Sequence, residues 1–207
     1  MRALAACRSP SPWILGLSCA LALGSLGCAA YHGAAKTVQP SEALHDGDWT
    51  FIPHFPRVMQ ESTYDCGAAS LAAVLRFWGK PTTPREVAAL ANQRGKMSAA
   101  DLERAAKASG LSAFAFYGTM KDLVYELSRG RPVIVGLGKA YETNRAIAHY
   151  EVVLGWERRE KKLLLLDPGR GFQVDHVDTF AKEWAVSHGV TVVAFLREGT
   201  PRTVGVN

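Results

Sequence analysis

Four side chains of this 207-residue chain have types and an order that could support nucleophilic catalysis: Gln60, Cys66, His149 and Asp167. A cysteine sulfur can attack a carbonyl carbon, and a histidine can carry the proton to the leaving group. An aspartate can fix the tautomer of that histidine and stabilise its imidazolium form, while a glutamine N–H can stabilise a developing oxyanion. Together these residues predict acyl transfer through a thioester.

Cys66 follows an irregular stretch and begins a helix that we expect to extend to Trp78, with Gly79 at its end. The unsatisfied N–H groups and the positive end of the helix dipole then lie beside the sulfur and favour the thiolate over the thiol. The main-chain N–H of Cys66 is the expected partner of Gln60 in an oxyanion hole. Gly67 is expected to leave the approach to the sulfur free of a side chain.

His149 lies at the start of an expected core strand over residues 148–156, which can hold its ring rigidly. Asp167 ends the next expected strand, over residues 162–167. Because two consecutive antiparallel strands form a hairpin, the second strand would bring Asp167 back beside His149. The chain therefore predicts a Cys-His-Asp arrangement built from one helix start and one hairpin.

The elements that must position these side chains form a helical first half and a strand-rich second half, which predicts an α+β fold. Capping signals at Thr83 and Ser98 begin two of the helices, and Gly110 and Gly130 end two. We expect helices over residues 66–78, 83–93, 98–109, 119–129 and 178–187, and strands over residues 111–117, 132–137, 148–156, 162–167, 172–177 and 190–197.

Composition argues against nucleic-acid binding and against metal or cofactor binding. The chain is 48% hydrophobic and 21% charged, as is usual for one globular domain. Its formal charge of +5 comes partly from two arginines in the first 27 residues. In the rest of the chain the numbers of basic and acidic residues are nearly equal, which does not predict a nucleic-acid surface. No paired Cys or His lies at metal-ligand spacing, so we expect neither a metal nor another cofactor.

The N-terminus resembles a secretory signal. Arg2 and Arg8 precede an apolar run from Trp13 to Leu26, which is shorter than the roughly 20 residues that span a bilayer. Residues 25–28, Ser-Leu-Gly-Cys, resemble a bacterial lipobox, in which Cys28 would become the lipidated first residue. A plain cleaved signal and a buried N-terminal helix are the alternatives.

This interpretation predicts four segments: a lipoprotein signal peptide over residues 1–27, a tether over 28–48, a domain over 49–200 and a tail over 201–207. Ala29 and Ala30 follow Cys28 without the aspartate that favours inner-membrane retention in the lipoprotein class. The expected location is therefore the outer membrane, facing the periplasm, with a soluble periplasmic or secreted protein as the alternative. Cys66 is then the only thiol that does not lie at or before the lipidation site.

Gln60, residues 65–69 (Asp-Cys-Gly-Ala-Ala), Leu71, His149 and residues 167–168 (Asp-Pro) resemble the papain-like cysteine peptidase family best known for bacteriocin-processing domains that remove double-glycine leader peptides. The resemblance extends from about Val58 to Phe195. It implies a helical half packed on a C-terminal antiparallel sheet.

The resemblance also implies the roles of the four residues. Cys66 would be the nucleophile, His149 the general base and acid, Asp167 the orienting residue and Gln60 the oxyanion donor. The familiar members of the family are fused to an ABC transporter, and this sequence contains no transporter segment. A separate exporter is therefore a candidate partner, beside the peptide or protein substrate and the lipid membrane.

Each residue also has a structural interpretation: Cys66 as a buried helix-start thiol, His149 as a strand-end histidine bonded to the backbone, and Asp167 as a turn residue. The four residues in this order, on these elements, favour a membrane-anchored thiol protease, a hydrolase of peptide bonds. Two alternatives stay open: a papain-like peptidyltransferase or amidase that uses the same residues, and a non-catalytic peptide-binding lipoprotein.

Overall fold

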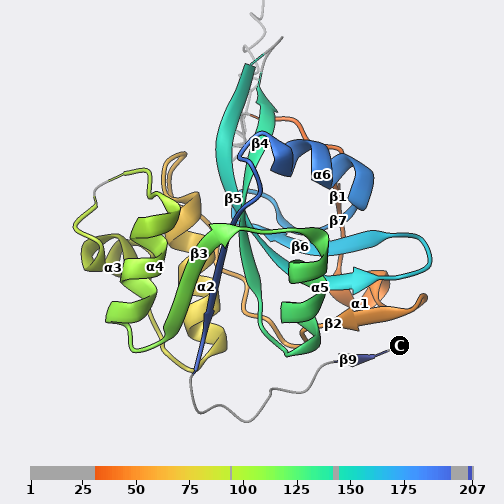
Figure 1. The fold of residues 1–207 in the computed structure, drawn as a ribbon, viewed down its shortest axis with the longest axis horizontal. Coiled ribbons are helices and arrows are strands. Elements are labelled where there is room, and N and C mark those ends of the chain that lie inside the picture. Colours follow the sequence, from red (N-terminus) through yellow and green to blue (C-terminus); the bar gives the residue numbers. More distant parts are fainter. Residues whose placement is uncertain (1–30, 94, 142–144, 197–204, 207) are drawn as a thin grey trace, which may run out of the picture.

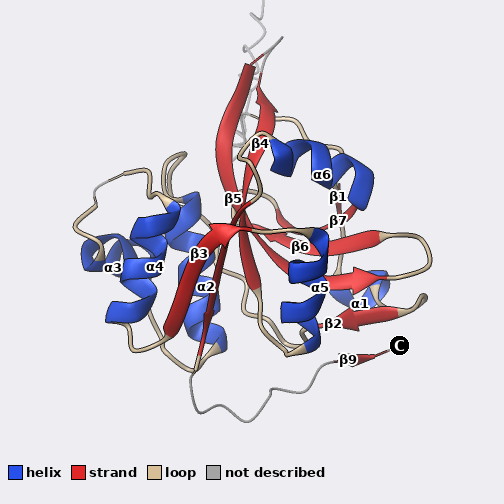
Figure 2. Ribbon diagram, viewed as in Figure 1, coloured by secondary structure: helices blue, strands red, loops and turns tan. Residues whose placement is uncertain are grey.

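The structure, a computed structural model, describes residues 31–93, 95–141, 145–196 and 205–206. Antiparallel strands form one sheet, and helices pack around it (Figures 1 and 2). The strand order is β1-β7-β6-β5-β4-β8-β3, and β2 pairs with β5 and with β9. Mixed helix and antiparallel sheet confirm the expected α+β class. Cys7, Cys19 and Cys28 lie outside the described residues.

The helices match most of the capping signals. Thr83, Ser98 and Thr119 each form a capping box with the third residue of the helix that follows. Gly79, Gly110 and Gly130, each just after a helix, have positive φ angles that favour glycine. The helices are α1 (Pro40–Ala43), α2 (Cys66–Phe77), α3 (Pro84–Leu90), α4 (Ala99–Ala108), α5 (Met120–Ser128) and α6 (Val177–Ala185).

The strands are β1 (Lys36–Thr37), β2 (Trp49–Phe51), β3 (Ser112–Tyr117), β4 (Val133–Tyr141), β5 (Arg145–Glu157), β6 (Lys162–Asp167), β7 (Gly171–His176), β8 (Val190–Phe195) and β9 (Gly205–Val206). The expected strands over 132–137 and 148–156 are longer in the structure, and together they form the β4–β5 hairpin that projects beyond the helices (Figure 1). The short β9 lies within the expected C-terminal tail and pairs with β2.

The register of the β5–β6 pair brings His149 and Asp167 together. In the β5–β6 pair, Val152 lies opposite Leu166. Because the strands are antiparallel, Asp167 lies one step further in the direction of His149. On the other side of β5, His149 is opposite Leu137 of β4, so its backbone is held in the middle of the sheet.

Residues 31–38, which we call the N-terminal strap, lie against the sheet although the sequence indicates a tether there. The His32 N–H donates to the Ala140 carbonyl at 2.7 Å, β1 pairs with β7, and the Val38 N–H donates to the Phe172 carbonyl at 3.0 Å. Main-chain pairing to strands needs no periodic apolar side chains, so the composition of this segment does not reveal it.

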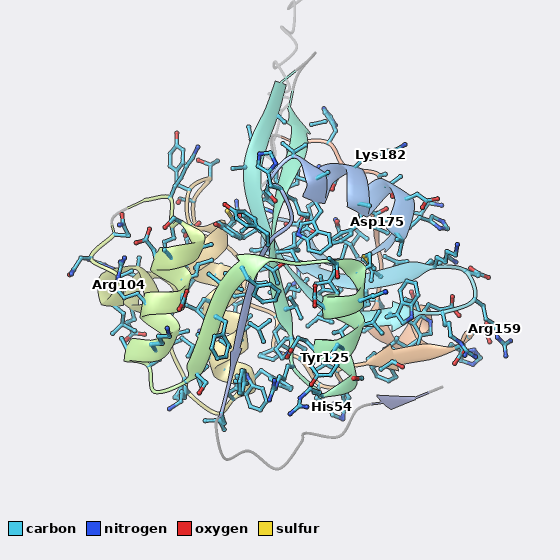
Figure 3. All side chains as sticks on the ribbon, in the orientation of Figure 1. His54, Arg104, Tyr125, Arg159, Asp175 and Lys182 are labelled. Atoms are coloured by element: carbon cyan, nitrogen blue, oxygen red, sulfur yellow. The ribbon has the colours of Figure 1, made fainter. Side chains whose placement is uncertain are left out.

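The core lies between α2 and the sheet, where the apolar face of α2 is almost entirely buried. Charged side chains lie on different sides of the molecule: Figure 3 shows Arg104 of α4 and Arg159 of the β5–β6 turn at opposite edges. No helix among the described residues is both long and apolar enough to cross a membrane.

Candidate active site

Cys66 is the first residue of α2 and is only 7% exposed. The loop before it is folded around the Asp65 carboxylate, which accepts hydrogen bonds from the N–H groups of Glu61 and Ser62 at 3.0 Å each. Because its carboxylate is turned toward this loop, Asp65 makes no side-chain cap to α2. It therefore leaves the N–H groups of the first helical turn for another acceptor.

Gly67 has a packing role that the sequence did not predict. A Cβ at this position would lie 3.1 Å from the Tyr150 ring and 3.5 Å from a Leu102 methyl group. Glycine therefore lets α2 pack closely against β5 and α4.

His149 lies between the other two members of the predicted triad. Its Nε2 atom is 2.9 Å from Oδ1 of Asp167, and its ring lies close enough to the Cys66 side chain for that side chain to raise the pKa of His149. Since Nε2 is hydrogen-bonded to Asp167, Nδ1 is the ring nitrogen that can exchange a proton with the sulfur. His149 and Asp167 are 3% and 0% exposed, so this dyad is shielded from bulk water.

The electrostatics of the dyad favour an ion pair. Burial by itself lowers the pKa of His149, but the hydrogen bond with Asp167 and the nearby Cys66 side chain outweigh it and raise that pKa to about 10. Burial by itself raises the pKa of Asp167, but the hydrogen bond and charge of His149 outweigh it and hold that pKa below its ordinary value. The structure thus supports an imidazolium beside a carboxylate at neutral pH.

Gln60 is positioned through its backbone. Its N–H donates to the carbonyl of Pro168 at 2.9 Å, which ties the loop before α2 to the turn that follows Asp167. Among the described residues, no hydrogen-bond partner meets its buried Oε1 atom. The side-chain oxygen is therefore free to accept a hydrogen bond from a ligand at the junction of the two segments that carry Cys66 and Asp167.

A buried ion-pair network adjoins His149. Glu151, on the same face of β5, has Oε1 4.0 Å from Nε2 of His149 and 2.8 Å from Nζ of Lys139. Lys139 Nζ also lies 2.6 Å from Oε2 of Glu183 in α6. Burial opposes the charge of Lys139, but the two carboxylates outweigh it and raise its pKa; burial raises the pKa of Glu151 despite Lys139.

The same region contains the one acidic and histidine cluster, within the described residues, that is compact enough for a metal ion. Ligand atoms of His149, Glu151 and Asp167 lie within 4.8 Å of one another. Asp167 already accepts a hydrogen bond from His149, and Glu151 is paired with Lys139. The ammonium group of Lys139 supplies positive charge where a cation would otherwise be needed, so the cluster is better described as an ion-pair network.

We expect Lys139→Met to destabilise the protein by about 3–5 kcal/mol, because it leaves the Glu151 charge buried and unpaired. The measurement is the free energy of unfolding in urea. Lys107→Met is the matched control, since it removes a lysine from an exposed ion pair with Glu103 and should change stability by at most about 1 kcal/mol. The loss in Lys139→Met should shrink as the pH falls, because protonation of Glu151 removes the unpaired charge. Equal stabilities for the two variants would contradict this prediction.

A residue from the N-terminal strap also enters the site. The hydroxyl of Tyr31 lies 2.6 and 2.7 Å from the two carboxylate oxygens of Asp167 and 3.1 Å from Nε2 of His149. Its ring centroid is 4.6 Å from that of His149, and the side chain is buried. Burial, and then the charge of Asp167, raise the pKa of Tyr31, so the phenol stays protonated and donates to the carboxylate.

The structure therefore brings together Cys66, His149 and Asp167, with Gln60 tied to the turn after Asp167. Sequence reasoning missed Tyr31, Glu151 and Lys139. A charged residue two positions after His149 in an apolar strand is a signal for a buried partner. No local pattern distinguishes Tyr31. The other histidines, His32, His45, His54, His176 and His188, form no part of this cluster.

The sequence profile of the Peptidase C39 family matches residues 54–194. No curated protein matches the chain. The fold is similar to that of the peptidase domain of Streptococcus ComA, a bi-functional ABC transporter, with a TM-score of 0.56 and 24% identity over 70% of this chain and all of that chain. It is also similar to a C39-like peptidase from Bacillus anthracis, with a TM-score of 0.59 and 16% identity over 73% of this chain and all of that chain.

A third similar structure is a double-glycine motif protease from an AMS/PCAT transporter in complex with the leader peptide. Its TM-score is 0.52, with 20% identity over 70% of this chain and 96% of that chain. At these identities the three structures show a shared fold.

Proposed function

Because this chain belongs to the Peptidase C39 family and is a cysteine-type peptidase, we propose that it hydrolyses peptide bonds with Cys66, His149 and Asp167 as its triad and Gln60 as an oxyanion donor. The observation that carries the proposal is the buried His149 ring, which forms a 2.9 Å hydrogen bond with Asp167 and lies near the Cys66 side chain. A packing role for the three residues would not require a buried histidine that is hydrogen-bonded to a carboxylate and lies near a thiol.

In the proposed reaction, the Cys66 thiolate attacks the carbonyl carbon of the scissile bond. The negative charge on the carbonyl oxygen is stabilised by the Cys66 N–H and the Gln60 side chain. The His149 imidazolium gives its proton to the leaving amine, and the C–N bond breaks to leave a thioester. Neutral His149 then takes a proton from water as the water oxygen attacks the thioester, and the C–S bond breaks to release the acid and restore the Cys66 thiolate beside the His149 imidazolium.

A surface groove supports a peptide as the substrate. A groove of about 1170 Å³ is lined by the loop over residues 61–65 and by residues of α3, including Arg85, Ala88 and Ala89. Asp65 lines the groove and Cys66 is the next residue along the chain, so a peptide that extends from the groove past Asp65 would reach the start of α2. A relative with the same fold is known with a leader peptide bound, which agrees with an extended peptide ligand.

The proposal is tested by incubating the protein with a defined peptide mixture and identifying new termini by mass spectrometry. Cleavage that stops after prior alkylation with iodoacetamide is expected. Adding a primary amine distinguishes hydrolysis from acyl transfer, because a transferase would place the amine on the new carboxyl end. Absence of any cleavage, with no faster alkylation at pH 6 than a free cysteine, would favour the peptide-binding alternative.

We also propose that Cys28 is lipidated and holds the protein on the outer membrane, facing the periplasm, with a separate exporter as a candidate partner. The lipobox-like residues 25–28 and the absence of aspartate after Cys28 support this location. Several acyl chains on one cysteine, each gaining about 0.8 kcal/mol per buried CH₂, would make a firm anchor.

Cys28→Ser should abolish incorporation of labelled palmitate in a bacterial host and leave residues 1–27 uncleaved at that site. Cys19→Ser is the matched control, since it lies in the same apolar run and should be labelled like the wild type. Labelling is read by autoradiography and the mature N-terminus by mass spectrometry. A wild-type protein that takes up no palmitate would show that the segment is an ordinary cleaved signal.

A further inference from the structure

The contacts of Tyr31 go beyond what packing requires. Its hydroxyl has one proton and lies within 2.7 Å of both oxygens of Asp167, so it donates to the carboxylate. The same oxygen is 3.1 Å from Nε2 of His149 and can accept from that N–H. Tyr31 thus contacts both members of the dyad, while its ring stacks at a tilt against the imidazole.

Several neighbouring residues hold the Tyr31 side chain in place. A Cβ on Gly169 would lie 2.7 Å from the Tyr31 hydroxyl, so glycine is needed for the phenol to reach Asp167. The Arg170 guanidinium lies 4.5 Å from the Tyr31 ring centroid and donates to the Tyr31 carbonyl. The strap is also fixed on the C-terminal side of Tyr31, by the His32–Ala140 bridge and by β1.

Tyr31 lies outside residues 54–194, the part of the chain that matches the family. We propose that Tyr31 is a positioning residue, supplied by the N-terminal strap, that fixes the Asp167 carboxylate and with it the orientation of His149. An ionised, fully buried carboxylate needs several donors to hold one rotamer, and Tyr31 joins the Gly169 N–H and His149 in this role. This inference rests on the proposed peptidase function.

An opposite role, in which the strap blocks the site, makes an opposite prediction. A blocking residue would raise turnover and thiol reactivity when it is removed, whereas a positioning residue would lower both. The hydrogen bonds of Tyr31 go to Asp167 and His149 and leave the Cys66 side of the ring free of the phenol, which favours positioning.

The test is Tyr31→Phe, which removes only the hydroxyl and keeps the ring against His149. We expect kcat to fall by roughly 10- to 100-fold, the scale of one lost hydrogen bond to a charged group, with KM nearly unchanged. Alkylation of Cys66 by iodoacetamide at pH 6 should also slow, and the thermal midpoint should stay within a few degrees. Tyr117→Phe, on an exposed side chain, is the matched control.

A cycle with Asp167→Asn tests whether Tyr31 acts through Asp167. In that background Tyr31→Phe should change kcat less than twofold, because the carboxylate is already gone. Gly169→Ala should mimic Tyr31→Phe and add little to it in the double variant, since its methyl group displaces the same hydroxyl. Wild-type kcat and alkylation in Tyr31→Phe, or a gain in either, would overturn the proposal. Alkylation needs no substrate, so a failure of the peptidase proposal would be recognised separately, as absence of cleavage by the wild type.

Discussion

Replacing Cys66 by alanine should abolish peptide hydrolysis and leave the fold intact. Loss of the nucleophile in a hydrolase with a triad lowers kcat by about six orders of magnitude, which brings turnover to background in an ordinary assay. The side chain is small, so removing one sulfur atom at the start of α2 should reduce stability by about 1 kcal/mol, or a few degrees in the thermal midpoint.

The measurements are turnover of a cleaved peptide and the thermal midpoint of the purified variant. Ser70→Ala is a suitable control because Ser70 lies one turn further along α2 and is also buried, with its hydroxyl donating to the Tyr150 carbonyl. It should keep its activity. Retained turnover in Cys66→Ala would remove Cys66 from the mechanism.

Replacing His149 by alanine should have the second largest effect, and it should appear in two separate measurements. Turnover should fall to near background because the proton carrier is lost. Alkylation of Cys66 at pH 6 should slow on the order of 10²-fold, because a cysteine without a cationic partner ionises near pH 8.5. Its alkylation rate should then rise with pH up to that value.

The wild type should behave differently with pH. Because the pKa of His149 is raised to about 10, the ring stays protonated from pH 6 to pH 8 and its charge continues to stabilise the thiolate. Deprotonation of the ring should therefore not lower the alkylation rate of the wild type over this range. The charged pair should weaken only when the pH rises toward 10, where the imidazolium loses its proton.

Gln60→Ala is the matched comparison for His149→Ala. It removes an oxyanion donor and leaves the thiolate untouched, so kcat should fall by roughly 10²- to 10³-fold with alkylation at pH 6 nearly unchanged. If His149→Ala alkylates as fast as the wild type at pH 6, His149 is not the partner of the sulfur.

The sequence predicts the parts of the site that depend on local signals. Thr83 and Ser98 begin helices through hydrogen bonds within four residues, so their capping boxes are visible in the sequence. His149 and Asp167 belong to consecutive strands, and a hairpin makes them neighbours with little choice of topology. The helix start places Cys66 by the same kind of local rule.

The remaining parts depend on long-range contacts. Tyr31 and Asp167 are 136 residues apart, and a hydrogen bond between them requires a segment without hydrophobic periodicity to lie along the sheet. Lys139 comes from β4 and Glu183 from α6, and only the packing of that helix on the strand brings their charges together. Spacing along the chain contains no information about either contact.

The position of Tyr31 at the beginning of the strap limits where the enzyme could find its substrates. With Cys28 acylated as we propose, three peptide bonds, through Ala29 and Ala30, would join the lipid-bearing Cα atom to that of Tyr31, and an extended chain spans at most about 3.6 Å per residue step, or roughly 11 Å here. The catalytic dyad would then lie close to the lipid headgroups and not at the end of a long flexible tether. Such an enzyme would act in a thin layer at the membrane surface, on chains that emerge from the bilayer or slide along it, and on soluble proteins only when they diffuse to that surface.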